Sequence, residues 1–243
     1  MRSPRDEIAA VAAESEAIAE AALKLIKVDY EPLPVIATAE EALSPGAPLV
    51  HGEDLVAPGA DGKPQVVHPA SHDNVAMTFQ YGQGDIAAGE SISDAIVEDV
   101  FKLHYVTHCC MGVSGVIAEF DASENLILYS NTQVPFLHKR EFADLLGMDP
   151  GASASSSRRS AAASGSKLDI YPFEPIAIYL AKITRRPVKL VFTREEEFIA
   201  SPTRQPVLMK MRSGCTRDGV LTFREVETVH DNGATSWVRP RPS

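Results

Sequence analysis

The chain of 243 residues is poor in cysteine and has no long apolar run. Its 3 cysteines include the adjacent Cys109 and Cys110, and such a set cannot form a disulfide framework. We therefore expect a reducing compartment and predict a cytoplasmic location. No stretch of about 18 apolar residues occurs, so no membrane-spanning helix is expected. Met1 is followed by charged and polar residues instead of an apolar signal core, which argues against secretion.

Basic residues are outnumbered by acidic ones. The chain carries 23 lysines and arginines against 33 aspartates and glutamates, which gives a formal net charge of -10. Nonspecific binding to nucleic acid or to an anionic membrane is not expected, because both attract positively charged proteins. Apolar residues make up 44% of the chain, which is too many for a disordered protein and enough for one large domain or two modest ones.

Common catalytic and nucleotide-binding motifs are absent from the sequence, which contains no GxSxG, P-loop or GxGxxG. His104 and His108 are four residues apart, and on a helix they would face a zinc ion together. The sequence around them, VFKLHYVTHCCMGV, is β-branched and aromatic and favours a strand, on which the two rings do not cluster. We predict no metal bound by side chains, and the residue types alone name no reaction.

Local patterns predict a mixed α+β fold. Residues 7–26 are rich in helix formers, and Gly147 is a suitable cap for a helix over 136–147. Residues 44–69 hold many prolines and glycines and are predicted to form a linker. Further elements are expected in the order edge strand over 27–36, strand over 126–130, helix over 173–183, strand over 187–193, and hairpin over 206–212 and 220–229.

One segment fits none of these patterns. Residues 151–166 read GASASSSRRSAAASGS and have neither apolar periodicity nor an aromatic residue. Composition alone assigns them to a flexible linker. On the same grounds Gln133, which follows a predicted strand, is an ordinary loop residue.

Several segments, taken together, resemble one protein family. Residues 9–34, AAVAAESEAIAEAALKLIKVDYEPLP, resemble the end of the α/β hammerhead domain in the large subunit of xanthine oxidase-type molybdenum hydroxylases. Residues 131–150 (NTQVPFLHKREFADLLGMDP), 165–206 and 218–234 resemble the first part of the molybdopterin-binding domain that follows it. The resemblance covers nearly the whole chain in the family's order.

The resemblance implies a domain division and a class of function. It assigns residues 1–43 to the end of a hammerhead domain, 44–69 to a linker and 70–243 to a partial molybdopterin-binding domain. The sequence over 167–175 and 194–206 is closest to the 4-hydroxybenzoyl-CoA reductase branch, which removes a phenolic hydroxyl from an aromatic CoA thioester. Two alternatives stay open: a subunit of an aldehyde, xanthine or carbon monoxide dehydrogenase-type hydroxylase, and a catalytically inactive, truncated family member.

The resemblance also implies a cofactor, partners and site residues. The cofactor is molybdenum held by molybdopterin, and the partners are an iron–sulfur subunit and an FAD subunit. Gln133 matches the family's TQ motif, whose neutral amide hydrogen-bonds near an oxo ligand of molybdenum. Ser164 and Gly165 match the end of a GGGFG loop, in which glycines let the backbone approach the cofactor. The family's catalytic glutamate falls beyond this sequence, so we expect the isolated chain to be inactive, and the question whether it binds the cofactor stays open.

Alanines at 161–163 stand where the family has the first glycines of that loop. We hypothesise that a one-base slip in the coding sequence caused this departure. One coding sequence for a family-like RVRVIQPPIGGGFG, with its first base removed, translates as ASASSSRRSAAAS, which is residues 152–164. A family-like WGATTPV that loses one G yields WVRPRPS, which is residues 237–243. Because the slip replaces apolar residues by serine, alanine and arginine, we predict an exposed, poorly ordered loop over 151–166.

Overall fold

The computed structural model describes residues 3, 6–52, 55–58, 64–68, 73–147, 153–157, 165–168 and 170–234. The chain divides into two compact units that are interleaved in sequence. The first unit comprises Met1–Glu31 and Thr107–Thr203, and the second comprises Pro32–Val106 and Arg204–Ser243. Each unit contains both helices and sheets, which confirms the predicted mixed fold.

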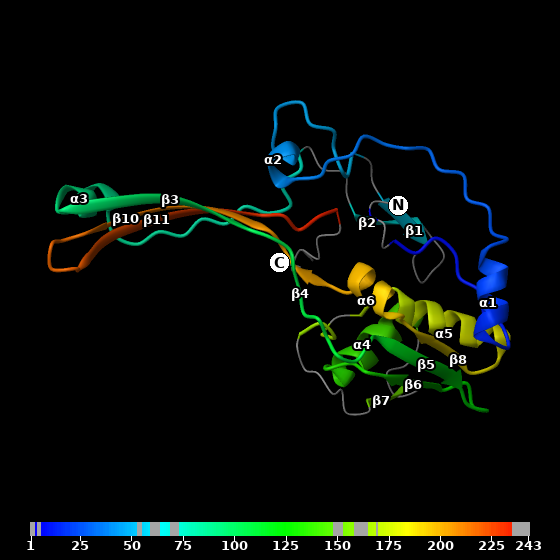
Figure 1. The fold of residues 1–243 in the computed structure, drawn as a ribbon. Coiled ribbons are helices and arrows are strands. Elements are labelled where there is room, and N and C mark those ends of the chain that lie inside the picture. Colours follow the sequence, from blue (N-terminus) through cyan, green and yellow to red (C-terminus); the bar gives the residue numbers. More distant parts are fainter. Residues whose placement is uncertain are drawn as a thin grey trace. The chain divides into compact units, whose positions relative to one another are not determined.

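A four-stranded sheet, with strand order β7-β6-β5-β8, organises the first unit (Figure 1). β5 pairs antiparallel with β6 and with β8, whereas β7 joins the edge of β6 in parallel. β7 is an edge strand and needs a ladder on one side only. The strands are β5 (Gly115–Phe120), β6 (Leu126–Ser130), β7 (Ser153–Ser157) and β8 (Val188–Val191).

One face of this sheet carries the core of the first unit. Side chains alternate along β5 and β6, so Val116 and Ala118 are buried on the same face as Leu126 and Leu128, while Ile117 on the other face is exposed. Two helices, α4 (Pro135–Leu146) and α5 (Phe173–Thr184), cover the buried face. The helical residues of the core are Phe142, Phe173, Ala177, Ile178 and Ala181.

The helices of the first unit begin and end at residues suited to those positions. α4 has Pro135 at its first position, where no backbone N–H is needed, and ends at Gly147 with φ 62, a left-handed cap. α6 (Arg194–Ala200) begins with a capping box between Thr193 and Glu196. α1 (Glu16–Leu23) is capped by the Ser15 side chain.

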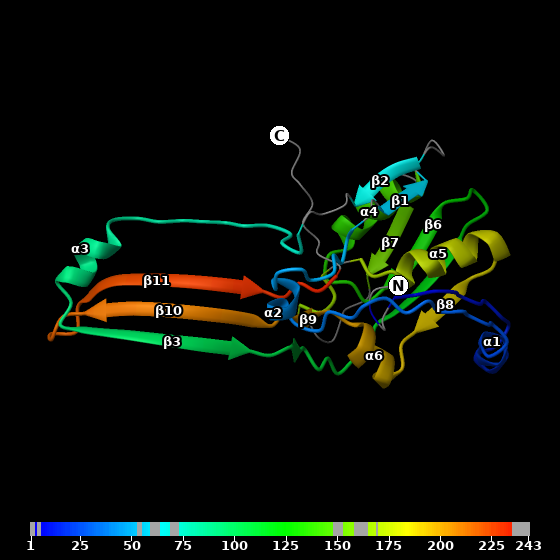
Figure 2. The ribbon, with the colours of Figure 1, turned by 90° about the horizontal axis from the view of Figure 1, so that it is seen from above.

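A three-stranded antiparallel sheet, with strand order β11-β10-β3, organises the second unit (Figure 2). Its strands are long: β3 (Ala95–Leu103), β10 (Val207–Cys215) and β11 (Leu221–His230). The short helix α3 (Ile86–Ser91) packs against β11 at Gly89, where a Cβ would lie 2.6 Å from the Thr222 carbonyl oxygen. The remaining elements are α2 (Ala39–Ala42), the hairpin of β1 (Leu55–Pro58) and β2 (Pro64–His68), and the two-residue strands β4 (Val106–Thr107) and β9 (Thr203–Arg204), which pair with each other.

Most predicted elements are confirmed, with small differences at their ends. The strand over 126–130, the helices over 136–147 and 173–183, the strand over 187–193 and the hairpin over 206–212 and 220–229 are β6, α4, α5, β8 and β10–β11. The helix predicted over 7–26 is shorter, because it begins only after the Ser15 cap.

Two predictions about extended segments are wrong. The edge strand predicted over 27–36 is not formed, because Pro32 and Pro34 lack the N–H groups that a ladder requires. The loop predicted over 151–166 is wrong for residues 153–157, which form β7 and pair with β6 through backbone groups. Residues 151–152 and 158–164 lie outside the described residues, so the prediction of an exposed loop there stays a prediction. Backbone hydrogen bonds do not depend on side-chain type, so a serine-rich segment can occupy a sheet edge. The predicted linker over 44–69 also contains the β1–β2 hairpin.

Candidate functional site

Gln133 lies in the short turn between β6 and α4, both of which are anchored by the core. β6 ends at Ser130 and α4 begins at Pro135, so four residues reverse the chain direction. The Gln133 backbone N–H donates to the Lys167 carbonyl oxygen at 2.9 Å. This bond joins the turn to residues 165–168, which come shortly before α5 in the sequence.

The side chain of Gln133 is clamped by the same segment. Its Oε1 accepts hydrogen bonds from the backbone N–H groups of Gly165 at 3.1 Å and Lys167 at 3.2 Å. Two donors to one oxygen orient the amide plane, so its Nε2 is left as a donor with no partner recorded among the described residues. The structure thus brings the predicted Gln133 and Gly165 together, while Ser164 lies outside the described residues.

Gly165 has a backbone that only glycine adopts without strain. Its φ is +91, and a Cβ at this position would lie 3.4 Å from Nε2 of His108. The glycine therefore permits both the turn and the short approach of its N–H to Gln133. The alanines at 161–163, which replace the family's other loop glycines, lie outside the described residues.

Lys167 is a buried cation beside Gln133 that the sequence analysis did not predict. Its side chain is 4% exposed, and its Nζ donates to the carbonyl oxygens of Gly112 at 2.7 Å and Val113 at 3.4 Å. Carbonyl oxygens compensate part of the cost of burying the ammonium group. No pattern of residue types signals this, because lysine is usually exposed.

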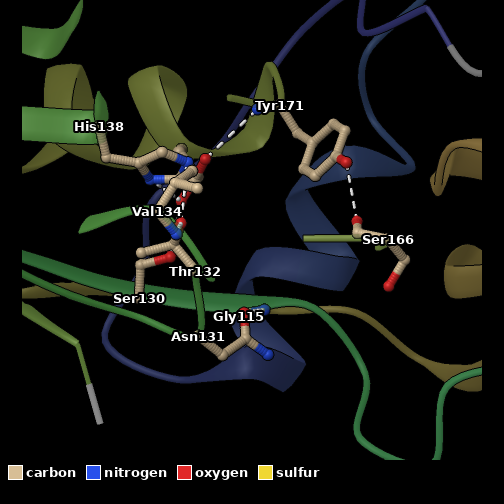
Figure 3. Close-up of polar contacts among 9 residues, drawn as sticks. Gly115, Ser130, Asn131, Thr132, Val134, His138, Ser166 and Tyr171 are labelled. Atoms are coloured by element: carbon tan, nitrogen blue, oxygen red, sulfur yellow. Dashed lines mark hydrogen bonds and ion pairs between the residues drawn. The ribbon is translucent and has the colours of Figure 1, made fainter. Parts of the chain in front are cut away.

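A cluster of buried polar side chains lies behind the turn (Figure 3). Oγ1 of Thr132 and Nε2 of His138 are 3.0 Å apart. The Ser130 hydroxyl donates to Oε1 of Glu174 at 2.7 Å, and that oxygen lies 3.5 Å from Nδ1 of His138. The Tyr171 backbone N–H donates to the other Glu174 oxygen at 3.3 Å.

Burial controls the ionisation of Glu174. Removal from water raises the pKa of its carboxyl group to about 7, against the opposing hydrogen bonds from Ser130 and the Tyr171 N–H. Glu174 and His138 are each about 1% exposed. A carboxyl group that titrates near neutral pH in a turn-supporting cluster is a frequent feature of functional sites. The sequence analysis missed both residues, because polar side chains inside helical patterns usually mark the solvent face.

The space between these groups is small. A cavity of about 10 Å³, room for a single water, is lined by residues that include Lys167, Tyr171 and Glu174. It cannot hold a ligand larger than water. This cavity is therefore not a site for an organic cofactor.

Neither a metal cluster nor a membrane span is found in the described part of the chain. No group of three or more His, Cys, Asp or Glu side chains there could hold a metal ion. The three cysteines are free thiols. No described helix combines the length and apolar character needed to cross a bilayer. The arrangement offers hydrogen-bond donors on a backbone held by the clamp.

Comparison with known proteins identifies the ligand class of the family. Residues 67–241 match the molybdopterin cofactor-binding domain. The chain is 32% identical over 240 residues to the probable hypoxanthine oxidase XdhD of Escherichia coli (strain K12), covering 91% of this chain and 25% of that protein. It is 30% identical over 235 residues to the nicotinate dehydrogenase large molybdopterin subunit of Eubacterium barkeri, covering 97% of this chain and 51% of that protein.

A solved structure agrees on the fold. The reconstituted CO dehydrogenase from Oligotropha carboxidovorans superposes with a TM-score of 0.75 at 21% identity, covering 89% of this chain and 26% of that one. The chain thus spans between about a quarter and a half of the length of these relatives. The match over residues 67–241 includes the whole clamp around Gln133. The chain belongs to the molybdopterin cofactor-binding domain family of the molybdenum-dependent oxidoreductases.

Proposed function

We propose that this chain forms one wall of the molybdopterin site in the large subunit of a xanthine, aldehyde or carbon monoxide dehydrogenase-type oxidoreductase. The observation that carries the proposal is the clamp on Gln133, in which two backbone donors hold Oε1 and leave Nε2 as a donor without a partner among the described residues. Family membership supplies the ligand class. The cytoplasmic location predicted from the sequence is kept as part of this proposal.

The described residues fit a molybdopterin cofactor at two positions. Gln133 presents a neutral N–H donor, which suits an oxo acceptor without adding charge. Gly165 has a positive φ and no side chain, so the backbone beside it stays accessible. Ser164, the third predicted contact, remains a proposal. When bound, the cofactor supplies the oxidation and reduction chemistry of the family, and these residues bind and orient it.

The substrate branch is a finer question with two candidates. Relatives named for hypoxanthine, nicotinate and carbon monoxide support the hydroxylase branch. The 4-hydroxybenzoyl-CoA reductase branch is supported only by the sequence resemblance over 167–175 and 194–206. The candidate ligands for CoA phosphates are Arg185, Arg186, Arg194 and Arg204. Of these, the Arg194 guanidinium already donates to the carbonyl oxygens of Cys110 and Met111. We therefore favour the hydroxylase branch.

Partner subunits and activity belong to the same proposal. An iron–sulfur subunit and an FAD subunit would exchange electrons with the cofactor in the assembled enzyme. The inactive alternative predicted from the frame slip makes a different statement, namely that the chain binds no cofactor at all. Cofactor binding therefore separates the two readings before any substrate is considered.

Binding of molybdopterin cofactor released from a molybdenum hydroxylase tests the proposal directly. The purified full chain is titrated without oxygen, and bound molybdenum and pterin fluorescence are measured per chain. We expect Gln133→Ala to weaken binding about tenfold, the value of one hydrogen bond to a strongly polar acceptor. Gln83→Ala, at an exposed position, is the matched control. No binding by the unmodified chain would contradict the proposal and favour the inactive alternative. Equal binding by Gln133→Ala would contradict the role that the proposal gives to Gln133.

A second measurement distinguishes the branches. The chain is assembled with the remaining large-subunit segment and the iron–sulfur and FAD subunits of a hydroxylase relative. The hydroxylase proposal predicts turnover of a heterocycle or an aldehyde with an electron acceptor. Turnover of an aromatic CoA thioester with a reductant would instead support the reductase branch.

A further inference from the structure

The turn that contains Gln133 is held by the hydroxyl group of Thr132. Oγ1 of Thr132 contacts Nε2 of His138 at 3.0 Å and accepts a hydrogen bond from the Val134 N–H at 3.1 Å (Figure 3). The turn is therefore tied to the His138 ring immediately before and after Gln133. A valine at position 132 would keep the shape of threonine and remove both interactions.

The segment that clamps the Gln133 side chain is tied to the same cluster. The Tyr171 hydroxyl donates to the Ser166 carbonyl oxygen at 2.7 Å, between the two backbone donors of the clamp. The Tyr171 N–H donates to Glu174, which lies 3.5 Å from the His138 ring. His138 and Glu174 thus connect the turn with the segment that holds its side chain.

The other groups around His138 and Glu174 come from the neighbouring segments. Lys167 and Tyr171 line the same small cavity, and the strand side contributes the neutral Ser114, Ser130 and Asn131. The Phe142 ring contacts His138 edge-on at 5.5 Å between centroids. A polar network enclosed in this way has few alternative arrangements, so it transmits a change at one member to the others.

We propose that the buried His138–Glu174 pair positions Gln133, by fixing the turn and the clamping segment relative to each other. His138 and Glu174 are positioning residues that do not touch the ligand. The inference deepens the proposed function, because the direction of the Gln133 amide decides what a bound cofactor meets. It concerns the chain itself and is tested without any cofactor.

Hydrogen exchange of the Gly165 and Lys167 backbone amides reports the clamp directly. In the purified full chain, Thr132→Val is expected to speed exchange of both amides about fivefold, the usual net effect of one lost hydrogen bond. Thr132→Ser restores the hydroxyl and is expected to restore protection. Thr222→Val is the matched control, because it removes a threonine hydroxyl that contacts Ser93 in the second unit. Unchanged exchange in folded Thr132→Val would overturn the proposal.

Two histidine variants separate positioning from general stability. His138→Gln can reach Thr132 with its terminal amide and is expected to keep the clamp protected. His138→Asn is too short to reach Thr132 and is expected to release the clamp, even where both variants lose similar global stability. Equal clamp exchange in the two variants would contradict positioning.

The unmodified chain provides a test that needs no variant. The Gln133 side-chain amide signal in nuclear magnetic resonance is expected to follow the ionisation of Glu174 near pH 7, while the exposed Gln80 and Gln83 amides stay constant. A Gln133 signal that does not move across that pH would overturn the proposal. Because no cofactor is present, failure here leaves the cofactor titration of Gln133→Ala as a separate test of the proposed function.

Discussion

The two units of this chain are stabilised in different ways. The first unit buries one face of its sheet under α4 and α5 and encloses a polar cluster behind Gln133. The second unit has the longer strands, yet every residue of β3 is exposed. At Gly89 and Gly214 of this unit there is no room for a Cβ atom beside Thr222, Phe223 or Ser93. Side-chain packing therefore dominates in the first unit, and the backbone ladder in the second.

A pair of phenylalanines gives the largest test of this difference. Phe142 is 1% exposed in the core of the first unit, whereas Phe101 on β3 is 45% exposed. Phe142→Ala is expected to cost about 3 to 5 kcal/mol of unfolding free energy, through lost burial and a cavity. Phe101→Ala should cost less than about 1 kcal/mol. Denaturant unfolding of the two variants measures both values, and similar losses would remove the contrast between the units.

The next effect depends on pH and belongs to the first unit alone. The pKa of Glu174 is raised from 4.5 to about 7 in the folded chain, so the folded state binds an extra proton between these values. Stability from this group is fully present below pH 4.5 and is lost as pH rises through about 7, a change of up to about 3 kcal/mol. Glu174→Gln keeps the acceptor for Ser130 without a titrating proton.

The Glu174→Gln variant is therefore expected to gain stability relative to the unmodified chain as pH rises from 4.5 to 7. Unfolding free energies at several pH values measure the difference. Glu119→Gln, at a partly exposed position on β5, is the matched control for replacing a glutamate by glutamine in the same sheet. A constant difference between Glu174→Gln and the unmodified chain across this range would refute the prediction.

Glycine substitutions reverse the comparison at particular positions, because Gly89 and Gly214 of the second unit leave less room for a Cβ than any glycine described in the first unit. At Gly214 a Cβ would lie 2.3 Å from the Ser93 Oγ and 2.4 Å from a Phe223 ring carbon. Gly214→Ala is expected to destabilise the second unit by about 1 to 3 kcal/mol. Gly112→Ala in the first unit meets nothing nearer than the Lys167 Nζ at 3.8 Å and should be tolerated. Amide exchange along β10 and β5 measures the two effects separately.

Helix caps give the smallest expected effects. Thr193→Ala removes the reciprocal capping box of α6 in the first unit and should cost about 1 kcal/mol. Asp85→Ala removes a single bond to Ala88 at the start of α3 in the second unit and should cost less. Exchange of the first-turn amides of each helix reports the losses. A larger effect at Asp85 would show that α3 contributes more to the second unit than its length indicates.

The parts of the fold that the sequence predicts correctly are those with local signals for the start, end or type of an element. Gly147 ends α4, and the sequence LILYS forms β6, because these signals act through the residue itself. The edge strand predicted over 27–36 is not formed, because two prolines interrupt its alternating pattern of apolar and charged residues. β7 could not be predicted from serines, because its position depends on a free edge supplied by β6.

The candidate site was predicted in part. Gln133 and Gly165 were singled out through the family resemblance, and they do meet in the structure, although their cofactor roles stay predictions. Lys167, His138 and Glu174 were missed, because burial of a charged or polar residue depends on partners distant in sequence. Domain boundaries at 43 and 69 also stay predictions, since the two structural units interleave along the chain.

The parallel ladder between β6 and β7 has a consequence for how such a gene tolerates error. A lost base rewrites every side chain downstream but leaves the peptide groups, and residues 153–157 contain no proline to interrupt them. An edge strand needs these peptide groups only for backbone hydrogen bonds to one neighbouring strand. We therefore expect the edge strand of a sheet to be the element of a fold that a frame shift disrupts least.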